Sequence, residues 1–150
     1  MNLSIRPATN ADIDAMIALA KHAATASQWP RRQYEAILCA EDRRRLTWVI
    51  EEEGRPQGFI VAGCLGQEWE IENIAIAGPA RRRGLGTRLL GEFLDVVRQQ
   101  GAESVFLEVR ESNQAARALY EKWTFIECGR RPRYYEHPPE DALVYRLSFE

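Results

Sequence analysis

The stretch from Ile74 to Leu90 constrains the fold of this chain more than any other. It contains a short apolar strand (74–76), a turn (77–80) and the loop Arg-Arg-Arg-Gly-Leu-Gly-Thr (81–87), and an amphipathic helix follows. A glycine-rich loop between a strand and a helix can surround a phosphate with backbone N–H groups and the positive end of a helix dipole. The stretch therefore predicts a pyrophosphate site, with a solvated arginine run and ordinary turn glycines as the alternative.

Two well-known phosphate motifs are excluded by single positions in this loop. A P-loop needs Gly-Lys-Ser/Thr where the chain has Gly84-Leu85-Gly86, and a Rossmann fingerprint needs a third small residue where Leu89 stands. The remaining signature is Arg-x-x-Gly-x-Gly, beginning at Arg81, directly after the apolar strand. This signature resembles the acetyl-CoA-binding motif of the GCN5-related N-acetyltransferases, the GNAT superfamily.

Length and composition indicate one globular domain over residues 1–150. Hydrophobic residues make up 45% and charged residues 28%, and no apolar run approaches the roughly 20 residues of a membrane span. The first residues lack the apolar core of a secretory signal, so a cytoplasmic protein is expected, with no membrane partner. A net charge of -2 provides no overall basic field, so no direct nucleic-acid binding is expected.

The cysteines and histidines argue against a metal site or a disulfide framework. Three cysteines cannot all pair, none forms a Cys-x-x-Cys pattern, and the two histidines are too few for a histidine-based centre. Cys64 and Cys128 lie in strand-like segments, where we expect small core residues.

The hydrophobic patterns predict an α/β sheet whose front half is antiparallel and whose later strands are joined by a parallel crossover. Expected strands lie at 3–6, 47–52, 58–64, 69–76, 104–110, 125–128 and 143–149, with residues 130–135 and 138–139 in the final connection. Expected helices follow the Thr9–Asp12 capping box, Trp29-Pro30, the glycine-rich loop, and Ser112 or Asn113, and Gly101 ends the third helix.

Two residues are candidates for acid–base catalysis. Glu108 is a carboxylate within an apolar strand, where burial favours proton uptake and makes it a competent proton acceptor. Tyr120 lies on the apolar face of the next helix. The plain alternatives are an ion pair of Glu108 with Arg110 or another neighbour, and a core role for Tyr120.

A longer block narrows the resemblance. Residues 107–121, Leu-Glu-Val-Arg-Glu-Ser-Asn-Gln-Ala-Ala-Arg-Ala-Leu-Tyr-Glu, resemble the block of the RimI-type ribosomal-protein-alanine N-acetyltransferases, as do Arg-Arg-x-x-Tyr-Tyr at 130–135 and Glu-Asp-Ala at 140–142. The resemblance implies a GNAT-like mixed, mostly antiparallel sheet of about seven strands, splayed between two central parallel strands and flanked by about four helices. It also implies a monomer or weak dimer that uses acetyl-CoA and no metal.

The resemblance assigns roles residue by residue. It implies that Glu108 is the general base, with Glu72 as a rival, and that Tyr120 is the general acid. Trp29 is either a wall of the acceptor site or a lid over the core. The resemblance implies that Ile74, Ala75 and Ile76 bind acetyl-CoA by their main chain, and that Asn113 binds its pantetheine or phosphate arm. It implies that the pyrophosphate is bound by Arg81, Arg82, Arg83, Gly84, Leu85, Gly86 and Thr87. The residues implied to bind the acceptor are Trp29, Glu72, Tyr134 and Tyr135.

The implied reaction is acetyl transfer from acetyl-CoA to the α-amino group of a protein, in particular an alanine-starting ribosomal protein of the small subunit. An α-amino group has a pKa near ~8, against ~10.4 for lysine, so one modest carboxylate suffices as the base. Acetylation of lysine side chains or of a small amine remains an alternative, as does a non-catalytic acyl-CoA-binding module.

The chain departs from the family pattern at two helix boundaries. The proline that usually follows Asp after the apolar strand is displaced by one position, to Pro79. Thr124 stands where glycine commonly ends the helix that carries Tyr120, which costs stability if φ is positive there.

Overall fold

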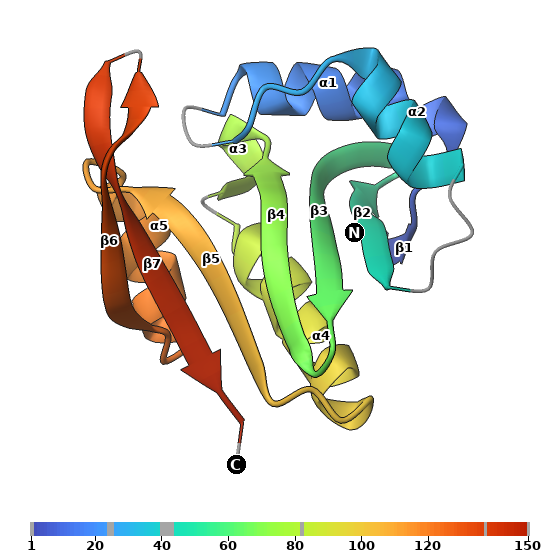
Figure 1. Cartoon of the computed structure of the whole chain (residues 1–150). Coiled ribbons are helices and arrows are strands. Elements are labelled where there is room, and N and C mark those ends of the chain that lie inside the picture. The colour runs from blue at the N-terminus through green and yellow to red at the C-terminus, as the bar shows by residue number, and fades with distance from the viewer. Residues whose placement is uncertain (1, 24–25, 40–43, 82, 137, 150) are drawn as a thin grey trace.

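A single seven-stranded sheet organises the computed structural model, which describes residues 2–23, 26–39, 44–81, 83–136 and 138–149 (Figure 1). The strands are β1 (Leu3–Pro7), β2 (Arg45–Glu52), β3 (Arg55–Leu65), β4 (Glu68–Ile76), β5 (Ser104–Arg110), β6 (Ile126–Glu136) and β7 (Pro139–Ser148). The helices are the 3-10 helix η1 (Asn10–Asp12), α1 (Ile13–Lys21), α2 (Arg31–Cys39), α3 (Gly78–Arg81), α4 (Leu85–Gln99) and α5 (Gln114–Lys122). No helix in these ranges is both long and apolar enough to cross a membrane.

The strand order β1-β2-β3-β4-β5-β7-β6 confirms the expected mixed sheet. Neighbouring strands pair antiparallel except β4 and β5, which run parallel because α4 connects them as a crossover. The splayed centre is also confirmed. Parallel pairing runs from Glu68–Ser104 to Ile71–Leu107. Beyond that pair, β4 continues to Ile76 beside β3, and β5 continues to Arg110 beside β7.

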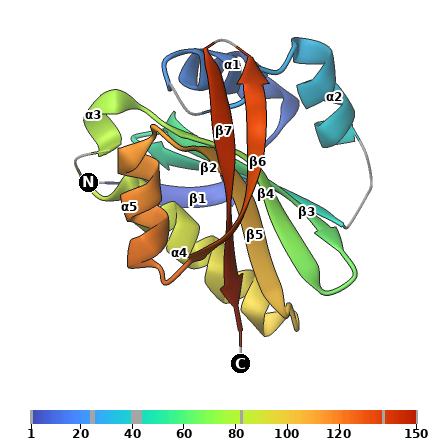
Figure 2. The same ribbon diagram turned by 60° about the vertical axis from the view of Figure 1, so that its left-hand side comes forward.

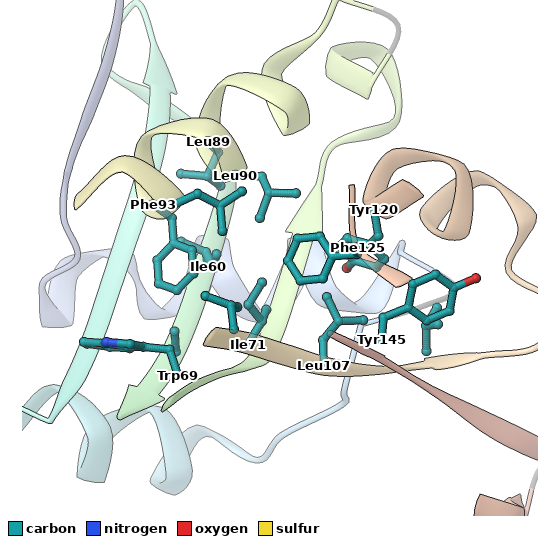
Figure 3. Packing of buried hydrophobic residues seen from close by; sticks show 14 of the residues in the cluster. Ile60, Trp69, Ile71, Leu89, Leu90, Phe93, Leu107, Tyr120, Phe125 and Tyr145 are labelled. Carbon is teal, nitrogen blue, oxygen red and sulfur yellow. The ribbon is translucent and has the colours of Figure 1, made fainter. Parts of the chain in front are cut away.

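Helices cover both faces of the sheet, so there are two hydrophobic clusters (Figures 1 and 2). On one face, α4 buries the residues that recur every four positions along it. Figure 3 shows this cluster, with Leu89, Leu90 and Phe93 of α4 packed over Ile60 and Ile71, and with Tyr120, Phe125 and Tyr145 gathered around Leu107. The second cluster lies under α1 and α2 and contains Met16, Tyr34, Val49, Phe59 and Ala75.

A β-bulge at Glu72 changes which side chains of β4 face each cluster. Ile71 pairs with Ala62 and Asn73 pairs with Val61, so Glu72 is an extra residue on β4. Side chains on a regular strand alternate with period two, which would place Ala75 on the same face as Ile71. Instead, Ile71 packs in the cluster under α4 and Ala75 in the cluster under α1 and α2. The bulge thus turns the last part of β4 relative to its first part.

Two expected boundaries are wrong, each for a local reason. The predicted turn at 77–80 contains the single helical turn α3, which Pro79 suits because the first residues of a helix need no N–H partner. The last two strands are much longer than predicted, since β6 and β7 form a hairpin through residues 130–135. Pro132 does not break it, because the pairing shifts between Arg131 and Tyr135 and Arg133 takes a φ of 51°.

The cysteine expectation is wrong for one residue. Cys128 on the edge strand β6 is exposed, and so is Cys39, while Cys64 is half-buried beside the larger cluster. The capping box is confirmed, because the Asp12 carboxylate accepts the Thr9 N–H at 2.7 Å and is also held by Arg6 at 2.8 Å. Gly101 follows α4 with a φ of 91°, as a helix stop requires.

Thr124 has a φ of 66°, so the structure confirms a strained residue at the end of α5. We expect Thr124→Gly to raise the free energy of unfolding by about 0.5 to 1 kcal/mol, because relief of the left-handed strain exceeds the added entropy of the unfolded glycine. Urea unfolding measures this. Thr124→Ala is the matched control, since alanine keeps the Cβ; equal stability of the glycine and alanine variants would contradict the expectation.

Candidate functional site

Two cavities meet where β4 and β5 diverge. The larger, of about 510 Å³, is named the wide cavity and the other, of about 320 Å³, the narrow cavity. Both are lined by Ala23, Ile74, Asn113, Ala116 and Tyr120, so they are contiguous across these residues. The separation of the two strands beyond Ile71 and Leu107 therefore forms a site that opens on two sides.

The narrow cavity lies between the end of β4, the start of α4 and the apolar face of α5. Ile74, Ala75 and Ile76 line it from β4, and Gly86 and Thr87 line it from α4. Because β4 has parted from β5 here, no strand ladder with β5 occupies that side of residues 74–76. The sequence prediction that residues 74–76 form a binding edge agrees with this placement.

Gly84 and Gly86 have different structural tasks at the start of α4. Gly84 is the N-cap with a φ of 77°, a conformation that favours glycine. Gly86 brings α4 close to β4, since a Cβ there would lie 3.3 Å from Ile76 Cγ1. Leu85 is buried in the core, so only its backbone can face a ligand. The first N–H groups of this 15-residue helix have no partner within the helix, so the predicted anion site at this position stays a prediction.

The structure describes only part of the arginine run that precedes α4. Arg83 forms an ion pair with Glu52 of β2, so an anion at this helix start would compete with Glu52 for it. Arg82 and the Arg81 side chain lie outside the described residues. Their predicted role in pyrophosphate binding stays a prediction.

Asn113 has a buried side-chain N–H donor that a ligand could satisfy. As the N-cap of α5, its Oδ1 accepts the Ala116 N–H at 3.1 Å, which fixes the orientation of the amide. Its Nδ2 is buried and has no hydrogen-bond partner within the described parts of the chain. Since a buried donor without a partner costs free energy, and since Asn113 lines both cavities, a ligand oxygen at their junction would satisfy it.

Tyr120 lies at the junction of the two cavities and is 5% exposed. Its ring packs against Phe125, with 5.7 Å between centroids, and against Tyr145, at 6.3 Å. Burial raises the pKa of the Tyr120 hydroxyl well above its ordinary value, and nearby Tyr135 adds to this rise. The hydroxyl therefore keeps its proton at neutral pH.

Glu108 lines the wide cavity, and its side chain is 14% exposed. Its neighbours Leu107 and Val109 point into the core, so alternation along β5 turns Glu108 toward the opposite face. Arg131 on the β6–β7 hairpin contacts Glu108 Oε1 through Nε at 2.9 Å. The charge of Glu108 also raises the pKa of nearby Tyr134. Glu108 therefore does form an ion pair, as the alternative expected, and its partner is Arg131 and not Arg110.

The two candidate bases differ in how firmly they are held. Arg45 binds both oxygens of Glu72, with Nε 2.9 Å from Oε1 and Nη2 2.7 Å from Oε2. Arg131 binds one oxygen of Glu108, and its side chain is 59% exposed against 32% for Arg45. A bidentate, less exposed pair is harder to break, so Glu108 is the more available carboxylate.

The four residues predicted to bind an acceptor occupy different positions. Glu72 and Tyr135 line the wide cavity. Arg110 lies 4.0 Å from the Tyr135 ring centroid, and burial raises the pKa of Tyr135 to about 12. Tyr134 is half exposed, next to Tyr135. Trp29 packs against Tyr34 and is not among the described residues that line either cavity, which favours its role as a lid over the second core.

Sequence reasoning missed several residues of this site. Ala116 and Leu119 line the narrow cavity, but their helical spacing predicted only a core face. Arg131 lay within the quoted Arg-Arg-x-x-Tyr-Tyr motif without a role. Asn73 lines the wide cavity and is buried. Its signal was a polar residue inside an otherwise apolar strand end, immediately before the Ile-Ala-Ile run.

Known proteins resemble this chain in sequence and in fold. The model of the acetyltransferase (GNAT) family matches residues 13–125. The chain is 34% identical over 109 residues to the ribosomal protein bS18-alanine N-acetyltransferase of Escherichia coli strain K12, covering 71% of this chain and 74% of that protein. The crystal structure of the ribosomal-protein-S18-alanine N-acetyltransferase from Escherichia coli superposes with a TM-score of 0.87 at 29% identity, covering 98% of this chain and 94% of that one.

A further relative is a longer protein. An uncharacterized protein of Mycobacterium leprae is 44% identical over 79 residues, which are 53% of this chain and 21% of that protein. The matched part is therefore about a fifth of that relative's length.

The close approach at Gly86 gives a test of the narrow cavity. We expect Gly86→Val to weaken acetyl-CoA binding about tenfold, a loss of about 1.4 kcal/mol, because the added side chain must displace Ile76 or the start of α4, which line the narrow cavity. Isothermal titration calorimetry measures the affinity. Gly129→Ala is the control, since its Cβ would make an ordinary 3.7 Å contact with Val144. Wild-type affinity in Gly86→Val would show that the ligand binds elsewhere.

Proposed function

Because the chain belongs to the acetyltransferase (GNAT) family, we propose that it transfers the acetyl group of acetyl-CoA to the α-amino group of a protein that begins with alanine. The carrying observation is the junction of the two cavities, where Tyr120 and Asn113 face both sides and Glu108 lies on the wide side. The similarity to bS18-alanine N-acetyltransferases supports a ribosomal protein as the acceptor.

The residues of the narrow cavity suit acetyl-CoA. The Ile74–Ala75–Ile76 edge provides main-chain groups for the amides of pantetheine, and the Asn113 Nδ2 provides a buried donor without a protein partner. The start of α4, with Gly84 and Gly86, provides N–H groups and the positive helix end for the pyrophosphate. When bound, the thioester supplies the acetyl group.

The wide cavity then receives the acceptor amine, and Glu108 acts as its base. A protonated α-amino group with a pKa near ~8 holds its proton by only about 1.4 kcal/mol at pH 7, so a carboxylate can remove it. The ammonium must first take the place of the Arg131 guanidinium on Glu108, and the exposure of Arg131 makes that exchange inexpensive. Acceptor binding thus replaces one cation by another.

Tyr120 completes the proton balance. Glu108 receives the first proton of the ammonium and later releases it to solvent. The nitrogen–carbon bond then forms as the carbon–sulfur bond breaks, and the Tyr120 hydroxyl gives its proton to the departing sulfur. The second proton that the nitrogen loses as the amide forms returns to the Tyr120 oxygen. With ordinary pKa values of about 10 and 8.5, the transfer from Tyr120 to sulfur is uphill by about 2 kcal/mol. Burial raises the pKa of Tyr120, but the same apolar surroundings raise that of a thiol beside it, so the gap does not widen by the full shift.

Holding the two reactants together contributes most to the rate. Positioning at a near-attack distance contributes several kcal/mol, up to roughly 7 to 11. A main-chain N–H of β4 beyond Ile71 would stabilise the carbonyl oxygen as charge develops on it. Attack is direct, because the amine enters from the wide side and the thioester from the narrow side, so no acyl-enzyme is required.

Two substitutions test the assigned roles. We expect Glu108→Gln and Tyr120→Phe each to lower kcat by 10²-fold or more while the dissociation constant of acetyl-CoA changes little, because proton transfer is removed and the donor cavity is retained. Steady-state kinetics and calorimetry measure the two quantities. Matched controls are Glu111→Gln, an exposed carboxylate near the end of β5, and Tyr145→Phe, a buried hydroxyl that bonds Glu121. Undiminished turnover in either test variant would refute that residue's role.

The acceptor class is tested with peptides that differ only in their first residue. We expect thiol release from acetyl-CoA with a free alanine terminus, and loss of release when that terminus is blocked, even if the peptide contains lysine. The reason is that an α-amino group has a lower pKa than a lysine side chain, so one carboxylate can deprotonate it. Equal activity on the blocked, lysine-containing peptide would indicate a lysine acetyltransferase. Binding of acetyl-CoA without turnover on any amine would indicate a non-catalytic module.

A further inference from the structure

Asn73 is a buried polar residue of the site to which the proposed mechanism gives no part. It is 4% exposed, lies on β4 immediately after the Glu72 bulge, and lines the wide cavity. A buried amide is costly unless its groups are hydrogen-bonded, so its partners indicate what it does.

Both the oxygen and the nitrogen of the Asn73 side-chain amide form hydrogen bonds with the main chain of one residue. The Ser27 N–H donates to Asn73 Oδ1 at 3.0 Å, and Asn73 Nδ2 donates to the Ser27 carbonyl at 3.0 Å. Ser27 lies between α1 and α2, 46 positions away in sequence. The side chain thus pairs with a loop residue as a neighbouring strand would, and joins the loop to β4.

The bulge at Glu72 explains how Asn73 reaches this loop. On a regular strand, Asn73 would share the face of Ile71, which packs under α4. The extra residue turns Asn73 to the face of α1 and α2, where Ser27 lies. The irregularity in β4 is therefore required for the contact.

The segment that Asn73 holds is a wall of the wide cavity. Ala26, Ser27 and Gln28 line this cavity together with Glu108. The same segment is fixed a second time, since Gln28 Nε2 donates to the Ala20 carbonyl at 2.6 Å. A wall made of a loop keeps its position only through such contacts, because it has no strand ladder of its own.

We propose that Asn73 is a positioning residue that fixes this wall and thereby limits the size of the acceptor's first residue. The inference rests on the proposed function, because it takes the wide cavity as the acceptor side. Ala26 and Ser27 line the cavity, and the two bonds from Asn73 prevent this wall from retreating before a larger first residue. Asn73 acts through the wall and not on the reacting atoms.

The test is the isosteric substitution Asn73→Asp, which keeps an acceptor for the Ser27 N–H but places a second acceptor against the Ser27 carbonyl. We expect the KM for an alanine-starting peptide to rise about tenfold, and the preference for alanine over a leucine-starting peptide to fall about tenfold. The dissociation constant of acetyl-CoA, measured without peptide, stays within about twofold. Hydrogen exchange of the Ser27 segment increases without global unfolding.

Ser104→Ala is the matched control, because Ser104 is 3% exposed and donates one side-chain hydrogen bond to Glu68 at 3.0 Å outside both cavities. It leaves the first-residue preference unchanged. Faster exchange at Ser27 in Asn73→Asp with an unchanged first-residue preference would overturn the proposal, as would equal losses of acetyl-CoA and peptide binding. If the wild-type protein acetylates no peptide terminus, the proposed function itself fails, and the inference with it.

Discussion

The end of parallel pairing between β4 and β5 is the constraint on which the site depends. Pairing stops after Ile71 and Leu107, while each strand continues beside its other neighbour. Beyond that point the side of β4 that faced β5 has no strand ladder, which is where an extended ligand can add its own polar groups. The same divergence opens the wide cavity on one side and the narrow cavity on the other. Under the proposed function, donor and acceptor reach the junction from different cavities.

Charges in the site are balanced by residues that a substrate can replace. Glu108 forms an ion pair with Arg131, and Arg83 forms one with Glu52. In contrast, Arg45 binds both carboxylate oxygens of Glu72. Under the proposed function, an ammonium takes the place of Arg131 and a phosphate competes with Glu52. Exchange of one partner for another yields little net affinity, but it keeps each charge paired in the free protein. Positioning by backbone and buried amides, at Asn113 and Asn73, then contributes more of the selectivity.

Much of this arrangement could be predicted from the sequence, because it depends on local patterns. Alternation along 104–110 placed Glu108 on the face opposite Leu107, and the glycine spacing indicated the start of α4. The long β6–β7 hairpin was missed, since Pro132 indicates a break unless a bulge removes it from the ladder. Arg131, Asn73 and Ser27 could not be placed, because their contacts join segments distant in sequence, and the contact between Asn73 and Ser27 also depends on the bulge at Glu72.

The central claim is that transfer occurs at the junction of the two cavities, and a crystal structure with a bisubstrate analogue tests it most directly. The analogue joins coenzyme A to the α-nitrogen of an alanine-starting peptide through an acetyl link. We expect the pantetheine in the narrow cavity along the end of β4, the link beside Tyr120 and Asn113, and the first peptide residue between Glu108 and the Ser27 wall. A peptide that leaves through the narrow cavity, or a link remote from Tyr120, would contradict it.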